Sequence, residues 1–160
     1  MGKNKGELSS QIIAERSRDL LNYQLSVIDS NHSKSGTLLS ICSLFIPLSF
    51  SVFKSLESNK IWFFFFSITI LLNFIGLVCF LMCLINRNYQ SGINPNLYDE
   101  LVEKKVEDIY LFEIGINRDS FNHNKNIINS QTNDLRWGLN CIVIAAALFT
   151  MLSLINLVYC

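Results

Sequence analysis

The chain has 160 residues, of which 50% are hydrophobic and only 16% charged, and its 13 basic and 13 acidic side chains cancel to a net charge of zero. Soluble domains hold about a quarter charged residues, so this composition favours a membrane protein, and a single unit is expected at this length. A net charge of zero offers no basic surface for phosphates, which excludes a nucleic-acid binder that depends on electrostatics.

The first polar segment, residues 1–35, is expected to be a cytoplasmic amphipathic helix. Apolar residues recur in it at helical steps, at Leu8, Ile12, Leu21, Leu25 and Ile28. No proline occurs before Pro47, so the helix is predicted to continue directly into the apolar run that follows. Both signs of charge are present, which favours a shaft that packs on partner helices over a helix lying flat on the membrane.

The polar residues between Asp29 and Gly36 join this helix to the membrane. One interpretation is that Lys34 extends its ammonium group to the lipid headgroups. The other is a gate or hinge, formed by Asp29, His32 and Lys34, in which Asp29 and Lys34 exchange partners.

Two runs without any charged residue follow, Gly36–Phe53 with 18 residues and Ile61–Ile85 with 25. A bilayer core of about 30 Å takes about 20 helical residues, with a range of about 17–25. Both runs are therefore predicted to span a membrane, as a hairpin over residues 36–85 joined by the connection 54–60.

Small and polar residues mark both of these runs. One face of the first run carries Ser40, Ser43, Pro47 and Ser51, and Asn73 lies at the centre of the second. Polar groups in hydrocarbon either bond between helices or line water. These residues are candidates for a helix interface or a pore, and strong ion selectivity is not expected because no charge lines the path.

Residues 86–137 are predicted to form a helical cytoplasmic insert. Pro95 lies near an expected helix start, and an apolar stripe predicts a helix over 97–116 that Gly115–Asn117 interrupts. A further helix is expected from Arg118 to Trp137 and on into the last apolar run. Within it, a spacing of seven indicates a helix seam at Phe121, Ile128 and Leu135.

The last run, Gly138–Cys160, has 23 residues without a charge and predicts a third transmembrane helix. Lys and Arg number five in residues 1–35, two in 54–60 and six in 86–137. Because positive residues accumulate on the cytoplasmic side, the N-terminus and the insert are expected in the cytoplasm. The sequence thus predicts an all-α integral membrane protein with three transmembrane helices and a helical cytoplasmic layer.

No constellation of residues indicates catalysis. The only histidines, His32 and His123, are not spaced for a metal, and all five cysteines lie within the apolar runs. We therefore expect no catalytic residue, no metal ligand and no cofactor, and the chain is not expected to be an enzyme.

The arrangement resembles a group of small bacterial anti-phage effectors. The shared features are a helix that ends Leu25-x-x-Ile28-Asp29, the sequence Lys34-Ser35-Gly36 entering the first span, a transmembrane hairpin, a helical insert and a C-terminal span. The group comprises the transmembrane effectors of the Pycsar type and related two-to-four-span effectors of nucleotide-signalling and retron defence systems. Its members commonly carry Asp-x-Lys-Ala here, whereas Asp29 and Lys34 are five residues apart in this chain.

The resemblance implies a multi-pass protein of the bacterial inner membrane that oligomerises and disrupts or permeabilises the bilayer on an infection signal (abortive infection). No soluble nucleotide-binding domain is visible, so a signalling nucleotide or a partner protein would be read by the cytoplasmic helices. The alternative is a non-conducting scaffold or accessory subunit of a larger membrane complex, whose helices would bind the same polar face.

Overall fold

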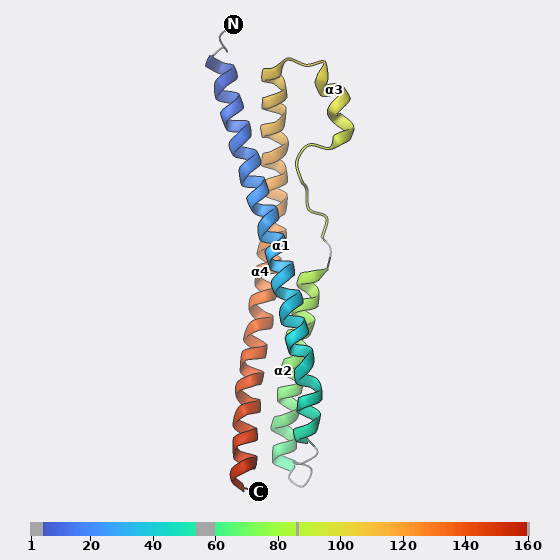
Figure 1. The fold of residues 1–160 in the computed structure, drawn as a ribbon, viewed down its shortest axis with the longest axis vertical. Coiled ribbons are helices and arrows are strands. Elements are labelled where there is room, and N and C mark those ends of the chain that lie inside the picture. Colours follow the sequence, from blue (N-terminus) through green and yellow to red (C-terminus); the bar gives the residue numbers. More distant parts are fainter. Residues whose placement is uncertain (1–4, 54–59, 86, 160) are drawn as a thin grey trace. The chain divides into compact units, whose positions relative to one another are not determined.

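The computed structural model describes residues 5–53, 60–85 and 87–159, and most of this part of the chain is helical (Figure 1). In chain order the elements are α1 (Lys5–Phe53), α2 (Lys60–Leu84), a 3₁₀ turn at Pro95–Leu97, α3 (Tyr98–Val102) and α4 (Val106–Tyr159). No strand occurs among the described residues, so the prediction of an all-α chain is confirmed.

Helix α1 is one continuous helix of 49 residues. The amphipathic N-terminal segment therefore does run on into the first apolar run, as predicted. The proposed hinge residues lie inside this helix, and Pro47 is accommodated within it.

Helix α4 is also continuous, over 54 residues, and corrects the prediction for the insert. The expected break at Gly115–Asn117 is wrong, because Glu113 and Asn117 hydrogen-bond to α1 on either side of Gly115 and hold the helix there. The chain instead leaves helical structure after α3, at Glu103–Lys105, where three charged residues offer no apolar side chain to bury. The helix start expected near Pro95 is confirmed as the 3₁₀ turn, whose first residue it is.

The chain divides into two compact units, which are described separately. We call Met1–Ser30 with Asn86–Asn129 the polar unit, and Asn31–Ile85 with Ser130–Cys160 the apolar unit. The apolar unit contains all three charge-free runs, and α1 and α4 contribute residues to both units.

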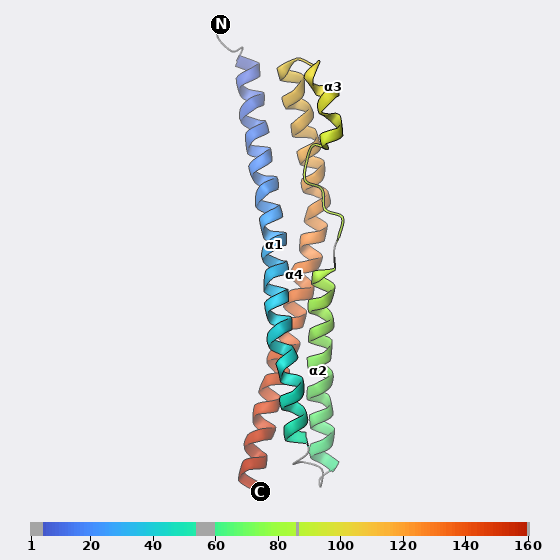
Figure 2. The same ribbon diagram turned by 45° about the vertical axis from the view of Figure 1, so that its right-hand side comes forward.

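In the polar unit α1 and α4 lie side by side and run parallel (Figures 1 and 2). The hydrogen bonds that join them include those of the pairs Arg18–Glu113, Gln24–Phe121 and Ser17–Asn117. The members of these pairs are 95, 97 and 100 residues apart in sequence. Because the separation in sequence is nearly constant along the pair, the two helices run in the same direction.

The buried rows of these two helices follow the three-, four- and seven-residue steps of a coiled coil. They consist of Ser10, Ala14, Leu21, Gln24 and Ile28 on α1, and Glu113, Asn117, Ser120 and Asn124 on α4. We call these rows the polar seam, because most members carry a polar side chain. The apolar stripe read from the sequence is only partly buried here, since Leu8 and Ile12 are 50% and 51% exposed. Phe121 and Ile128 are also only half-buried and lie beside the buried row.

An extended segment, residues 87–94, takes the place of a third helix in the polar unit, and we call it the strap. The Asn124 side chain accepts a hydrogen bond from Gln90 N at 2.9 Å and donates one to Gln90 O at 2.8 Å. Gly92 has a φ of +97°, and a Cβ there would lie 2.9 Å from Asn117 Oδ1. The strap therefore follows α1 and α4 closely, and only glycine fits at its nearest approach.

In the apolar unit α2 runs antiparallel to α4 (Figures 1 and 2). A Cβ on Gly76 would lie 2.7 Å from Ile142 Cδ1, and one on Gly138 would lie 2.6 Å from Phe80 Cε1. Small residues at both contacts let the two helices approach closely, which is how transmembrane helices commonly pack. The buried side chains of this unit include Cys42, Phe66, Phe80, Cys83, Ala145 and Leu152.

Two of the described helices are long and apolar enough to cross a membrane, α2 over Trp62–Leu84 and α4 over Val106–Ile155. The first charge-free run, in α1, is not one of these two, so three transmembrane helices remain a prediction. The connection expected at 54–60 lies, apart from Lys60, outside the described residues.

Candidate functional site

The hydroxyl-bearing face predicted in the first apolar run points out of the apolar unit. Ser40, Ser43, Pro47 and Ser51 are all exposed on α1. The Ser40 hydroxyl donates to the Gly36 carbonyl at 2.9 Å, and the Ser43 hydroxyl donates to the Ser40 carbonyl at 2.8 Å. Because these hydroxyls are satisfied within their own helix, the face can meet lipid, a neighbouring helix or water.

A second small-residue row on α1 faces inward and was not identified from the sequence. Ser35, Cys42 and Ser49 are buried and seven residues apart. The Ser35 hydroxyl is buried without a hydrogen-bond partner. The signal that would have found this row is the same heptad spacing that governs the polar seam.

The structure places Asn73 on a different surface from Ser40 and Ser43. Asn73 lies beside Ser49 on a hollow of about 180 Å³ between α1 and α2, whose other lining residues are Ile46, Ile70, Phe74 and Leu77. Its Oδ1 atom is buried and has no hydrogen-bond partner. The candidate pore residues thus fall on two surfaces, an outward face of α1 and a hollow against α2.

Of the three proposed hinge residues, His32 takes part in contacts between helices. The His32 Nε2 atom lies 2.9 Å from Gln131 Nε2 on α4, and the same Gln131 amide donates to Cys83 O on α2 at 3.4 Å. Because an amide nitrogen only donates, His32 Nε2 is the acceptor in this contact. Nearby, Asn31 Nδ2 donates to Thr132 Oγ1 at 3.4 Å. These polar contacts hold α1, α2 and α4 together at one end of the apolar unit.

Asp29 and Lys34, the other two hinge candidates, are exposed on α1. Neither forms an ion pair in the part of the chain that the structure describes. The predicted exchange of partners between Asp29 and Lys34 therefore remains a prediction. His32 is the hinge candidate whose contacts the structure describes.

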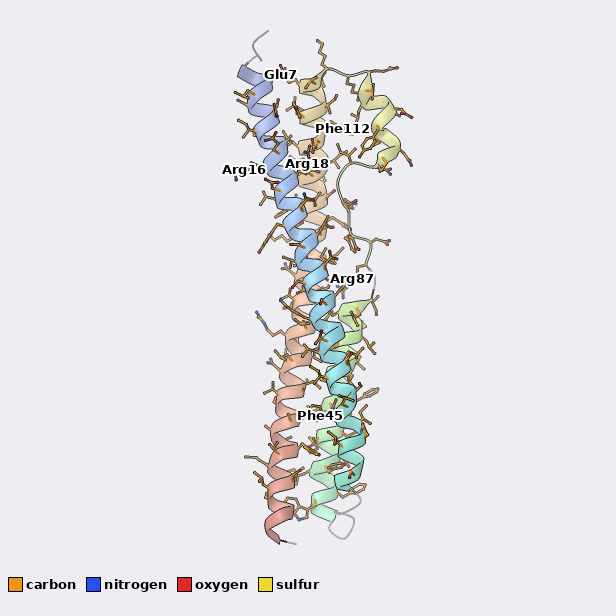
Figure 3. All side chains as sticks on the ribbon, viewed as in Figure 1. Glu7, Arg16, Arg18, Phe45, Arg87 and Phe112 are labelled. Carbon is orange, nitrogen blue, oxygen red and sulfur yellow. The ribbon has the colours of Figure 1, made fainter. Side chains whose placement is uncertain are left out.

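The polar unit contains an ion pair that the sequence reading overlooked. Arg18 donates to both carboxylate oxygens of Glu113, from Nε at 2.8 Å and from Nη2 at 2.9 Å. The Glu113 side chain is 9% exposed and that of Arg18 is 56% exposed. In Figure 3 Arg18 lies on the side of α1 toward α4, whereas Arg16 points away. The sequence does contain a signal for this pair: Glu113 is a carboxylate within the apolar series that includes Phe112 and Ile116, and a carboxylate in such a position needs a cationic partner.

The hydrogen bond and the charge of Glu113 raise the pKa of Arg18. A cationic group whose pKa is raised on folding contributes stability that is present below its unfolded pKa and is lost only as the pH rises through the folded value. The guanidinium therefore stabilises the polar unit throughout the neutral range. Beside this pair, a cavity of about 420 Å³ is lined by Leu21, Ile93, Tyr98 and Asn117, among other residues.

Among the described residues, no group of three or more His, Cys, Asp or Glu side chains is placed to hold a metal ion. Comparisons of the chain with protein-family models, with curated proteins and with solved structures found no match. The function is therefore inferred from the arrangement of the residues described above.

Proposed function

We propose that this chain is a membrane effector of bacterial anti-phage defence, which oligomerises and permeabilises the inner membrane on an infection signal. The observation that carries the proposal is the outward face of α1, where an apolar helix exposes Ser40, Ser43, Pro47 and Ser51. A helix that meets only lipid has no need of small hydroxyl side chains along one face. Their placement is typical of a surface that contacts other helices or water.

An oligomer would bring several copies of this face together. Small side chains allow α1 helices to approach closely, and serine hydroxyls can bond either to their own backbone or to water. Because the face carries no charge, a water path along it would pass ions with little selectivity. Loss of the membrane potential is the expected consequence.

The proposal includes three membrane spans, with the N-terminus and the polar unit in the cytoplasm. The polar unit then reads the infection signal, delivered by a signalling nucleotide or a partner protein. Its cavity beside Arg18 and Tyr98 is the place where a small molecule would contact both a cation and an aromatic ring.

A non-conducting scaffold or accessory subunit is the second candidate function. It is favoured by one observation, that the Ser40 and Ser43 hydroxyls already bond to backbone carbonyls and need no water. In that case the same face binds the helices of a larger membrane complex.

Induced expression in bacteria with a membrane-potential dye separates the two functions. The parent chain is expected to depolarise cells, and the double variant Ser40→Leu/Ser43→Leu is expected to leave the potential intact while inserting normally. The matched control changes exposed apolar neighbours on the same helix, Ile41→Leu/Leu44→Ile, and should depolarise like the parent. A normal potential with abundant inserted parent protein, in phage-infected as well as in uninfected cells, would contradict the effector. Recovery of a larger membrane complex that the serine variant loses would support the scaffold.

A further inference from the structure

Gln131 on α4 connects all three helices of the apolar unit through one amide group. The residue is 1% exposed. Its nitrogen lies 2.9 Å from His32 Nε2 on α1 and donates to the Cys83 carbonyl on α2 at 3.4 Å. Its oxygen, Oε1, is buried and has no hydrogen-bond partner. The amide thus holds both other helices through its nitrogen, and its acceptor is unused.

The partners of Gln131 fix which end of the amide faces them. A backbone carbonyl only accepts, so the amide atom that faces Cys83 O is the nitrogen. The same nitrogen faces the ring of His32, and it can donate there only while His32 Nε2 carries no proton. An imidazolium carries a proton on both ring nitrogens. The contact between His32 and Gln131 therefore belongs to an uncharged ring.

His123, in the polar unit, has the opposite arrangement. Its Nε2 atom lies 2.9 Å from the carbonyl oxygen of Asn88, which only accepts, so the ring donates there. A second proton enters at the other ring nitrogen and leaves this bond in place. His123 and His32 are the two histidines of the chain, and His32 is the one whose contact is incompatible with a charged ring.

A charged His32 presents the Gln131 amide with two incompatible partners. The Nε2–H group of an imidazolium needs an acceptor, whereas Cys83 O needs a donor from the same end of the amide. A half-turn of the amide brings the unpartnered Oε1 to His32 and takes the nitrogen away from Cys83 O. The bond gained is charge-assisted and about twice as strong as a neutral one. The bond lost is long, at 3.4 Å, so the half-turn is favoured once the ring is protonated.

We propose that His32 and Gln131 form a proton-driven switch, in which protonation of His32 turns the Gln131 amide over and detaches it from α2. With the ring uncharged, Gln131 links α4 to α1 and to α2. With the ring charged, it links α4 to α1 alone. Histidine is the side chain whose charge ordinarily changes between about pH 5 and pH 8, so the switch responds to acidification of the cytoplasm. His32 is partly exposed, which gives protons access to the ring.

Other titratable and charged groups lie near His32 along the three helices. They are Asp29 and Lys34 on α1, Cys83 on α2 and Asp134 on α4. The two groups on α1 are exposed, and Asp134 is half-buried. The Cys83 thiol is buried and donates to the Asn31 carbonyl at 3.9 Å. Within the part of the chain that the structure describes, the His32 ring forms no ion pair and its hydrogen bond is to Gln131.

Nuclear magnetic resonance of the full-length chain in detergent micelles tests the switch. Histidine, glutamine and cysteine are isotope-labelled, and spectra are recorded between about pH 5 and pH 8. At the upper end of this range the His32 Nε2 signal should be that of an unprotonated nitrogen. As the ring titrates, the signals of the Gln131 side-chain amide and of the Cys83 carbonyl should shift with the same midpoint, because the amide turns over.

Matched variants separate the switch from a general effect of acid. His32→Gln keeps a hydrogen-bonding amide but does not titrate, so the pH-dependent shift of the Cys83 carbonyl should be lost. Gln131→Leu should leave His32 titrating without any shift at Cys83. The control is His123→Gln, which should retain the full shift. Circular dichroism confirms that each variant is as helical as the parent.

Three results would overturn the switch. They are a His32 Nε2 atom that carries a proton at about pH 8, a ring that stays uncharged down to about pH 5, and a Cys83 carbonyl that does not shift while His32 titrates. The proposal concerns contacts inside the apolar unit and does not depend on the proposed effector function. Failure of the switch leaves depolarisation of cells unaffected as a test of that function, and a normal membrane potential leaves the switch in place.

Discussion

At the scale of single residues, the polar unit is organised by side chains that bond to distant backbone. Asn124 is fully buried and pairs with both the N–H and the carbonyl of Gln90. It acts toward the strap as a neighbouring β-strand would, with one donor and one acceptor. Tyr89, Gln90 and Ser91 of the strap are exposed. These two hydrogen bonds, together with the contact of His123 Nε2 with Asn88 O at 2.9 Å, attach the strap to α4.

Replacing Asn124 by Ala should therefore loosen the strap at Gln90. We expect a loss of about 1–3 kcal/mol in the free energy of unfolding of the polar unit, because two part-buried hydrogen bonds are removed. Hydrogen exchange at the Gln90 amide should become rapid. Asn126→Ala, at an exposed position two residues away, is the control and should change stability by less than about 0.5 kcal/mol. Unchanged protection of Gln90 in the Asn124 variant would contradict this role.

The Arg18–Glu113 pair gives a second residue-scale prediction. Arg18→Ala leaves a buried carboxylate without its bidentate partner and should cost about 1–3 kcal/mol of stability, with the exposure of the guanidinium keeping the effect below that of a fully buried pair. Arg16→Ala, on the exposed side of the same helix, should be nearly neutral. Because folding raises the pKa of Arg18, its contribution should not titrate between about pH 6 and pH 9. Thermal unfolding of the parent and both variants across that range checks each statement.

At the scale of elements, two glycines of α4 differ in the space around them. A Cβ on Gly115 of α4 would meet nothing within 4 Å, whereas one on Gly138 of the same helix would lie 2.6 Å from Phe80 Cε1 and 3.1 Å from Cys79 Cβ. Phe80 is fully buried and has no room to move aside. The first glycine only lowers the helix propensity, and the second is required for the packing of α4 on α2.

Alanine substitutions should therefore act in opposite directions. Gly115→Ala should stabilise α4 by about 0.5–1 kcal/mol, since it removes backbone freedom from the unfolded chain at no steric cost. Gly138→Ala should destabilise the apolar unit by about 1–3 kcal/mol through overpacking. Thermal unfolding in detergent measures both, and a destabilised Gly115 variant would indicate a constraint that the helix does not display.

The elements were more predictable than the surfaces on which they meet. Missing charges located the apolar runs, and the absence of proline before Pro47 predicted that the N-terminal helix continues into the first of them, because these are local properties of the sequence. The packing row of α1 was identified only in part. Leu21 and Ile28 are buried as hydrophobic periodicity indicates, but the same periodicity selected the exposed Leu8 and Ile12, while the buried row also runs through Ser10 and Gln24. A polar residue is recognised as buried only when its partner is known, and Asn117 lies 100 residues from Ser17.

At the scale of the whole molecule, the number of spans decides where the two ends of the chain lie. Three spans place the ends on opposite sides of the membrane, and two place them on the same side. A phosphatase that is active only outside the cytoplasm, fused after Cys160, should be active if α1 crosses the membrane. A fluorescent protein that folds only in the cytoplasm, fused at the N-terminus, should be bright and serves as the orientation control. An inactive phosphatase with a bright N-terminal fusion would show that α1 does not span.

The parallel pairing of α1 and α4 also has a consequence for biosynthesis. The two sides of the polar seam are 95–100 residues apart, so α1 leaves the ribosome long before its partner exists. At about 5–20 residues per second, this delay is roughly 5–20 s. A wholly apolar row on α1 would invite aggregation for that time, whereas Ser10 and Gln24 remain hydrated until α4 is made. These two residues therefore reduce the apolar surface that the nascent helix exposes, at the expense of some stability in the finished protein.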